Sequence, residues 1–195
     1  MAGRKSIASA ARRIPGGLTA SRNWFLFGAH RKRLTMSLPR HPRGGRYFED
    51  FSVGETIAHG LTRTVTQMDN MLFSNMTLNP QPLHIDAHFC ATETEWGRPI
   101  VNSLFTLGLM IGISVNDTTV GTTIANLGMT EVKFPAPVFE GDTIRVESEV
   151  ASTRESRSRP DAGIVEFIHR AYKPDGTLVA ECRRQAFMRK APQKG

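Results

Sequence analysis

Alternation of hydrophobic and polar positions predicts strands in the second half of the chain. Residues 144–150 carry an apolar or small side chain at every second position, with charged residues between them, which is the period of a half-buried strand. Residues 165–171 repeat this alternation, and residues 124–134 and 177–188 have the composition of strands. Because no helix separates the later strands, and Lys-Pro-Asp-Gly at residues 173–176 predicts a hairpin turn, we expect an antiparallel meander. The positions expected to face inward are Ile144, Val146, Ser148, Val150, Val165, Phe167, His169 and Ala171.

A helical period predicts a helix at residues 67–76, after a first strand at residues 55–65. Thr66 precedes this helix and is suited to cap its N-terminus. We expect one face of the helix to pack in the core, because methionine fills irregular gaps there. The residues on that face are Met68, Met71, Leu72 and Asn75.

Residues 100–115 are apolar on nearly every side. The segment is shorter than the ~20 apolar residues that a membrane span needs, so it predicts a buried helix and no membrane partner. Pro99 is expected to set the start of this helix, and Gly108 and Gly112 to let another backbone approach closely. A buried helix and a curved antiparallel sheet together predict an α+β fold in which the sheet wraps around the helix.

Charge divides the chain into two parts. The net charge is +7, yet residues 1–46 hold eleven Arg or Lys and no acidic residue, which leaves fourteen basic and eighteen acidic residues at positions 47–195. The later part therefore lacks the basic surface that nucleic-acid-binding domains carry, and we expect no nucleic-acid partner. We expect a basic leader at residues 1–46, one domain at residues 47–190 and a short tail at residues 191–195.

The leader is rich in Arg, Ser and Ala, which is typical of a mitochondrial transit peptide. Alternatively, translation begins at Met36 and residues 1–35 are never made. The first interpretation predicts the mitochondrial matrix and the second the cytoplasm, and both compartments are reducing. The two cysteines, Cys90 and Cys182, are too few for a disulfide framework, and we expect both to be packed thiols.

The candidate chemistry of the chain lies at residues 79–86, Asn-Pro-Gln-Pro-Leu-His-Ile-Asp. Each proline fixes its own φ and restricts the residue before it, which predicts a stiff loop. Histidine is the side chain whose ordinary pKa lies near neutral pH, so His84 is able to exchange a proton during a reaction. Asp86 has an alternative structural role as the N-cap of the helix that follows it.

Three motifs, in this order, resemble the MaoC-like dehydratases, the (R)-specific enoyl-CoA hydratase branch of the hot-dog superfamily. They are the loop at residues 79–86, Arg-Pro-Ile at residues 98–100 and Pro-Val-Phe-Glu-Gly-Asp at residues 137–142. The resemblance covers residues 47–189 and implies a hot-dog fold. Asn-Pro-Gln-Pro-Leu-His at residues 79–84 is similar to a sub-branch that includes mesaconyl-CoA hydratase and β-methylmalyl-CoA dehydratase, which implies branched or dicarboxylic acyl-CoA substrates.

The chain departs from the family pattern at several site positions. Asn79 falls where the family carries a catalytic aspartate, and Gln81 falls on the usual asparagine. Asn102 and Ser103 replace the His-Gly pair before the central helix. Because an amide does not ionise, Asn79 cannot act as a general base in the way an aspartate can.

The resemblance implies reversible addition of water to a trans-2-enoyl-CoA. His84 would act as the base in one direction and as the acid in the other, with Asn79 holding the water. A different carboxylate could replace the family aspartate. Asp86 ranks first for that role, ahead of Asp69 and Glu93.

The backbone amide of Ser103, at the start of the apolar helix, would stabilise the enolate oxygen of the thioester. Asn102 and Gln81 are weaker site candidates, and simple packing or loop hydrogen bonding is an alternative for each. His88 lies four residues after His84, but no third ligand at a metal spacing is evident, so we expect no metal site.

Three functions are compatible with the sequence. The leading one is an acyl-CoA hydratase or dehydratase that acts as a homodimer, with no cofactor beyond the coenzyme A of its substrate. A hot-dog thioesterase would make Asn79 less unusual, because such enzymes use amide side chains near the central helix. A non-catalytic acyl-CoA binding subunit would explain the missing aspartate.

Overall fold

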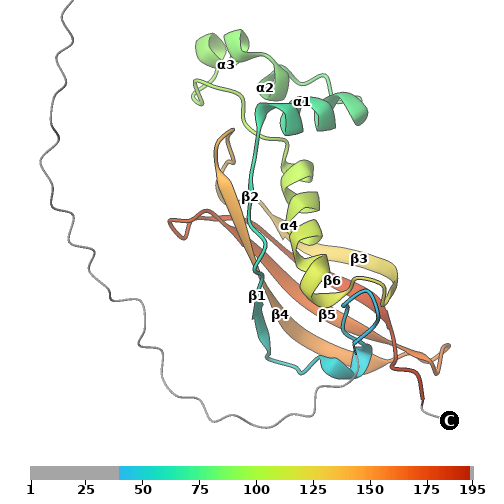
Figure 1. The fold of residues 1–195 in the computed structure, drawn as a ribbon. Helices are drawn as coiled ribbons and strands as arrows, with labels where there is room; N and C mark the ends of the chain where they lie inside the picture. Colours follow the sequence, from blue (N-terminus) through green and yellow to red (C-terminus); the bar gives the residue numbers. More distant parts are fainter. Residues whose placement is uncertain (1–39, 194–195) are drawn as a thin grey trace, which may run out of the picture. The chain divides into compact units, whose positions relative to one another are not determined.

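A computed structural model describes residues 40–193 (Figure 1), and the predictions for residues 1–39 lie outside it. One antiparallel sheet forms the body of this region, with the strand order β1-β4-β5-β6-β3, and β2 pairs with β4 beside it. Helix α4 lies along one face of the sheet, and α1 to α3 are gathered at one end of α4 (Figure 1). The α+β prediction of a sheet wrapped around an apolar helix is confirmed.

The predicted meander is present as β4 (Thr143–Glu155), β5 (Ala162–Tyr172) and β6 (Leu178–Arg189). Gly176 takes a φ of 90° in the turn between β5 and β6, a conformation that glycine adopts without strain. All the positions predicted to face inward on β4 and β5 are buried, because alternate side chains of a strand share one face.

The edges of the sheet differ from the sequence prediction in one respect. The strand predicted at residues 55–65 is two short strands, β1 (Thr56–Ala58) and β2 (Arg63–Thr64), both paired with β4. Between them the side chain of His59 is buried, and its amide still donates to the Val146 carbonyl of β4 at 3.0 Å. At the opposite edge, β3 (Thr123–Lys133) pairs with β6 through three register shifts.

Helix α4 (Ser103–Thr118) begins later than predicted. Pro99 does not set its start, because Ile100 forms a bridge with Phe139 and the next residue is still extended. Asn102 is the N-cap instead, and its side-chain oxygen accepts a hydrogen bond from the Leu104 amide at 3.0 Å. The start of the helix is therefore set by a capping side chain rather than by the proline.

Helix α4 is buried on one side only, which corrects the prediction of a helix enclosed all round. Met110 and Ile113 are fully buried against the sheet, whereas Leu104 is 58% exposed. Gly108 and Gly112 are exposed, and a Cβ atom added to either would meet no atom within 4 Å outside its own stretch of helix. The close backbone approach predicted at these glycines thus does not occur within residues 40–193. Among the described residues, no helix is long and apolar enough to cross a membrane.

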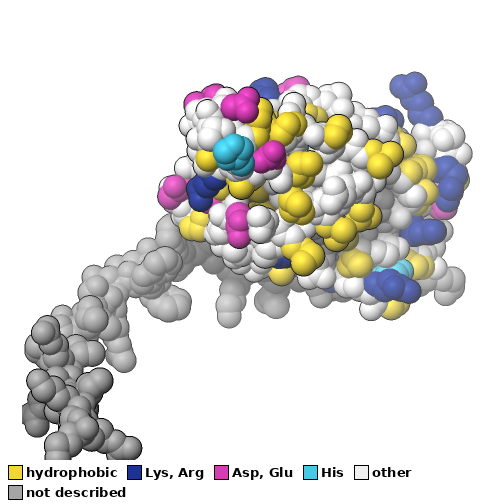
Figure 2. Space-filling view, turned by 90° about the horizontal axis from the view of Figure 1, so that it is seen from above, with side chains coloured by type: hydrophobic (Ala, Val, Ile, Leu, Met, Phe, Trp, Pro, Cys, Tyr) yellow, Lys and Arg dark blue, Asp and Glu magenta, His cyan; other side chains and the backbone are white. Residues whose placement is uncertain are grey.

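Helix α1 (Gln67–Met76) has the predicted bounds, and Thr66 caps it as predicted. Of the face predicted to pack in the core, however, Met68, Leu72 and Asn75 are exposed and Met71 is half-buried. The buried residues of α1 are Asn70 and Ser74. Figure 2, which looks onto the end of the molecule that carries α1 to α3, shows hydrophobic side chains spread across this surface. The exposed large apolar residues of α1 and the turn after it are Met68, Leu72, Met76 and Leu78.

Two short helices follow α1. Helix α2 (Pro82–Ile85) contains His84, so the stretch predicted to be a loop includes one helical turn. The first proline of that stretch stays outside the turn, and Pro82 occupies its first position, where a missing amide hydrogen costs nothing. Helix α3 (Ala87–Glu93) follows directly, and its Cys90 is a buried free cysteine, as is Cys182 on β6. The prediction of packed thiols is confirmed.

Candidate functional site

His84 lies in α2 with its ring fixed by one main-chain contact. Its Nδ1 is 2.9 Å from the carbonyl oxygen of Ile100. Because a carbonyl only accepts hydrogen bonds, Nδ1 carries the hydrogen, and the neutral ring keeps the lone pair of Nε2 for another proton. The half-buried ring lines a cavity of about 300 Å³. The lining of that cavity is Gln67, Asn70, Met71, His84, Ile85, Ala87, Arg98, Pro99, Val101, Glu140 and Gly141.

Asn70 connects His84 to the start of α4, and the sequence analysis did not identify it. Its side-chain nitrogen donates to the carbonyl oxygens of His84 at 2.8 Å and of Ile100 at 3.1 Å. Its side-chain oxygen accepts from the amide of Asn102 at 2.9 Å. A signal was present in the sequence: Asn70 and Ser74 are polar residues four apart, on the side of α1 opposite its methionines.

Two charged residues line the cavity beside His84. Arg98 stacks on the ring of Phe139, with its guanidinium carbon 4.2 Å from the ring centroid. Such stacking holds an exposed arginine in place without an acidic partner. Glu140 is the one acidic side chain in this lining, and it follows Phe139 on the turn before β4. The cavity therefore combines a proton-exchanging imidazole with one cation and one carboxylate.

The N-terminus of α4 opens into a neighbouring cavity. Ser103 lines a mostly apolar space of about 230 Å³ together with Trp96, Thr106 and residues 134–138. Since Asn102 donates its own amide hydrogen to Asn70, the next free amide at the helix start is that of Ser103. Val101 lines both cavities, so His84 and Ser103 lie on the two sides of one extended segment.

The remaining predicted site residues do not line the His84 cavity. The side-chain oxygen of Asn79 accepts from the amide of Gln81 at 3.1 Å, within the turn after α1. Gln81 itself is exposed, and its side chain makes no cap contact to α2. Asp86 caps α3, accepting from the amide of Phe89 at 3.0 Å, which is the alternative role that the sequence predicted.

The other two candidate carboxylates are also placed away from His84. Asp69 completes the capping box of α1 with Thr66 and bonds Arg63 at 2.8 Å. Burial opposes ionisation of Asp69, but its hydrogen bonds from Thr66 and the charge of Arg63 lower its pKa. Glu93 is exposed at the last residue of α3. Neither residue lines the cavity that contains His84, whereas Glu140 does.

A second group of titratable side chains is sealed inside the fold. The Ser148 hydroxyl lies 2.8 Å from Nε2 of His59 and 2.6 Å from Nδ1 of His169, and Nδ1 of His59 lies 3.2 Å from Asp117. The order Asp, His, Ser matches a nucleophilic triad, but Ser148 has no exposed surface, so no substrate reaches it. We interpret this chain as a structural link between α4 and the sheet. Sequence spacing could not reveal it, because its members come from four separate segments.

Burial also sets the charge of these two histidines. It lowers the pKa of His169 to about 3, and the nearby charge of Arg184 acts in the same direction. It lowers the pKa of His59 as well, although Asp117 opposes that shift. Both rings are therefore neutral at pH 7. Within residues 40–193 there is no group of three or more His, Cys, Asp or Glu side chains placed to hold a metal ion.

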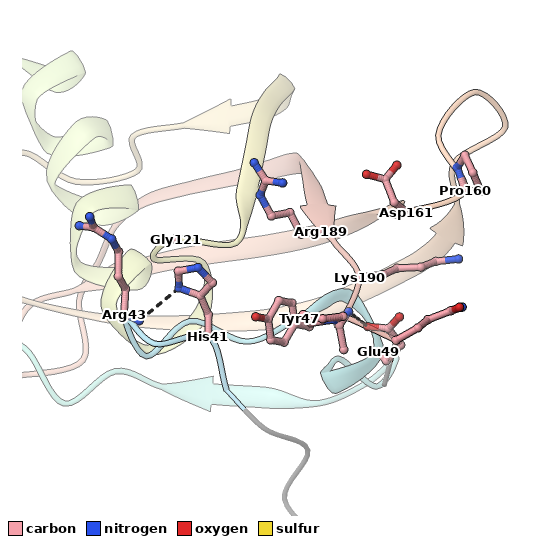
Figure 3. A pocket seen from close by; sticks show the side chains of 12 residues that line it. His41, Arg43, Tyr47, Glu49, Gly121, Pro160, Asp161, Arg189 and Lys190 are labelled. Carbon is pink, nitrogen blue, oxygen red and sulfur yellow. Dashed lines mark hydrogen bonds between the residues drawn. The ribbon is translucent and has the colours of Figure 1, made fainter. Parts of the chain in front are cut away.

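A larger cavity of about 830 Å³ lies at the other end of α4, between the first described residues and the end of β6 (Figure 3). Several of its polar groups have partners within the protein. Nδ1 of His41 accepts from the amide of Arg43 at 3.2 Å, Glu49 accepts from the amide of Ala191 at 3.0 Å, and Asp161 pairs with Arg159. None of the predicted site residues lines this cavity, and we assign it no chemistry.

Comparison with known proteins relates this chain to one protein family. Residues 50–171 match the model of the MaoC-like domain. The mesaconyl-CoA hydratase of Cereibacter sphaeroides is 33% identical over 75% of this chain and 42% of its own length. The 3-hydroxybutyryl-CoA dehydratase of Methylorubrum extorquens is 32% identical over 58% of this chain and 69% of its own length. The chain spans less than half the length of the mesaconyl-CoA hydratases that it matches.

A solved structure supports the fold. A protein of Mycobacterium tuberculosis with a double hotdog fold superposes with a TM-score of 0.70, covering 78% of this chain and 46% of that one at 23% identity. The hot-dog fold expected from the three sequence motifs is confirmed. With the family match covering more than half of its residues, the chain belongs to the MaoC-like domain family.

Proposed function

We propose that the protein is an acyl-CoA hydratase or dehydratase, which adds water reversibly to the double bond of a 2-enoyl-CoA. The observation that carries the proposal is the state of His84: its Nδ1 is fixed on the Ile100 carbonyl, and its Nε2 is left to exchange a proton beside a cavity. Two relatives with about one third identity are named for this chemistry, one as a mesaconyl-CoA hydratase and one as a 3-hydroxybutyryl-CoA dehydratase.

His84 is the proton carrier of the proposed reaction. In the hydration direction Nε2 takes a proton from water, the water oxygen bonds to C3 of the enoyl group, and the electron pair of the double bond moves toward the thioester. The resulting enolate then takes a proton at C2 from the His84 imidazolium, so that one water is added in total. A histidine suits both steps because its ordinary pKa lies near neutral pH.

The negative charge of the enolate requires hydrogen-bond donors. The amide of Ser103 at the N-terminus of α4 is the proposed donor, supported by the positive end of the helix dipole. Because Ser103 and His84 line adjacent cavities within one chain, we propose that a second copy of the chain completes the site. The exposed side of α4 and the open edge of β3 are the surfaces available for that pairing.

Glu140 is the proposed substitute for the aspartate that the family carries where this chain has Asn79. It lines the same cavity as His84, and a carboxylate there can orient the water by accepting a hydrogen bond from it. Thioester hydrolysis that uses Asn79 receives no comparable support, because Asn79 faces Gln81 rather than this cavity. We propose that no cofactor is required beyond the coenzyme A of the substrate.

The test is to follow crotonyl-CoA and mesaconyl-CoA with two readouts in the same reaction. We expect loss of enoyl absorbance with at least one substrate and no release of free thiol. Release of thiol without loss of the enoyl group would replace the hydratase proposal with a thioesterase. Binding of both thioesters without either change would indicate a non-catalytic acyl-CoA binding protein.

A further inference from the structure

Asn70 is buried in the middle of the proposed site and makes all its side-chain hydrogen bonds with main-chain groups. The residue is 4% exposed. Its two N–H bonds donate to the carbonyls of His84 and Ile100, and its oxygen accepts from Asn102. The orientation of the amide is unambiguous, because two carbonyls require donors and one N–H requires an acceptor.

The contacts of Asn70 tie together two segments that are distant in sequence. One is the helical turn that carries His84, and the other is the extended stretch from Ile100 to the N-cap of α4. The Ile100 carbonyl accepts from both Nδ1 of His84 and the side chain of Asn70, which occupies both of its lone pairs. A carbonyl held in this way has one orientation, and the ring bonded to it has one tautomer.

The same side chain also decides which amide is free at the start of α4. The Asn102 amide is engaged with Asn70, and the Leu104 amide is engaged with the side chain of Asn102. This leaves the Ser103 amide, between them, to face a ligand. Asn70 thus acts on both halves of the proposed chemistry, the proton carrier and the oxyanion donor. It lines the His84 cavity, but all its side-chain hydrogen bonds are made to main-chain groups, so it acts through these two segments.

We propose that Asn70 is a positioning residue that fixes the tautomer of His84 and its placement relative to the N-terminus of α4. The kinetic part of this inference rests on the proposed hydratase activity, whereas the tautomer of His84 does not depend on it. Displacement of a catalytic group by about 1 Å is able to cost about 100-fold in rate, so the loss of three anchoring bonds should act mainly on kcat.

Helix α1 offers a matched control one turn further along the same buried face. Ser74 is fully buried like Asn70, but its hydroxyl has no hydrogen-bond partner within residues 40–193. Asn70→Leu removes all three bonds while keeping the branched shape and the number of heavy atoms of the side chain. Ser74→Ala changes a buried polar side chain on the same face without removing a bond to either segment.

The kinetic experiment compares the two variants with crotonyl-CoA as substrate. We expect Asn70→Leu to lower kcat by about 10- to 100-fold with a smaller change in KM, and Ser74→Ala to stay within about twofold of the wild type. Equal losses of kcat in both variants, or a change confined to KM in Asn70→Leu, would overturn the proposal.

The spectroscopic experiment uses nitrogen-15 NMR of the histidine rings and requires no turnover. In the wild type, neutral His84 should carry its hydrogen on Nδ1, and in Asn70→Leu it should shift toward a mixture of tautomers. An unchanged His84 signal in a folded Asn70→Leu protein contradicts the inference, whatever the activity of the wild type.

A second variant covers the case in which Asn70→Leu does not fold. Asn70→Asp is nearly isosteric and can still accept from Asn102, but when ionised it faces two carbonyl oxygens without a donor. We expect it to reduce kcat at pH 7 to a similar extent as Asn70→Leu. Wild-type kcat in Asn70→Asp would refute the positioning role.

Discussion

A main-chain carbonyl, rather than an acidic side chain, holds the ring of the proposed catalytic histidine. Nδ1 of His84 donates to Ile100, and the turn around His84 is completed by the bond from the Ile100 amide to the carbonyl of Leu83. A carbonyl fixes the tautomer without placing a full charge beside the ring. The carboxylate required to orient water must therefore come from another part of the cavity, and Glu140 is the residue available there.

Glu140 provides a test at the level of a single side chain. We expect Glu140→Gln to lower kcat for enoyl-CoA hydration by about 10-fold or more, because general acid–base groups contribute ~10²–10⁴-fold. Steady-state kinetics with crotonyl-CoA measures the effect. Glu93→Gln is the matched control, since Glu93 is exposed at the end of α3 and outside the cavity. Equal activity of the two variants would remove Glu140 from the mechanism.

At the scale of elements, strand positions were predicted well, because alternation depends only on which face of β4 and β5 is buried. Helix boundaries and helix faces were predicted less well. The start of α4 depends on the capping contact of Asn102, and the buried face of α1 depends on three bonds from Asn70 to distant segments. Such contacts exist only after folding, so local periodicity cannot identify them.

The sequence likewise predicts some residues of the candidate site and not others. His84 and the Asp86 cap could be identified from the loop sequence, and both are where the motif places them. Glu140 could not, because it lies on a turn far along the chain. The polar spacing of Asn70 and Ser74 marks a face of α1, but it does not show that this face is buried against His84. What joins them to His84 is tertiary packing rather than spacing.

The buried histidines that link α4, β4 and β5 predict how stability depends on pH. Burial lowers the pKa of His169 from its ordinary 6.5 to about 3, so the unfolded chain binds the proton more readily. The stabilisation that neutral His169 gives to the folded state is complete well above pH 6.5. It is lost progressively as the pH falls toward about 3. For one such histidine, the free energy of unfolding falls by up to about 1.4 kcal/mol for each unit by which the pH is lowered.

Urea unfolding at pH 7 and pH 5 measures this dependence. We expect the free energy of unfolding to be lower at pH 5 than at pH 7. His169→Gln should make this difference smaller, because it removes one of the titrating rings. His88→Gln is the control, since His88 is exposed on α3 and contributes no buried ring. A pH dependence that is the same in all three proteins would contradict the assignment to His169.

At the scale of the whole molecule, the exposed side of α4 predicts association with a second copy. Gly108 lies on that side, and a Cβ atom added there meets no atom within 4 Å outside its own stretch of helix in one chain. Gly108→Leu should therefore leave the protomer folded but separate a dimer that packs along α4. Sedimentation of the wild type as a dimer and of Gly108→Leu as a monomer is the expected result. A wild-type monomer that is fully active would contradict a shared site.

The role of His84 is tested by comparing it with His88, a second histidine in the same stretch of chain. His84 lines the cavity, whereas His88, four residues later, is exposed on α3 and lies outside it. Hydration of crotonyl-CoA is followed at 25 °C by loss of enoyl absorbance for the wild type, His84→Ala and His88→Ala. We expect kcat to fall by at least about 100-fold in His84→Ala and by less than about twofold in His88→Ala. Wild-type turnover in His84→Ala would contradict the central claim that His84 carries the proton.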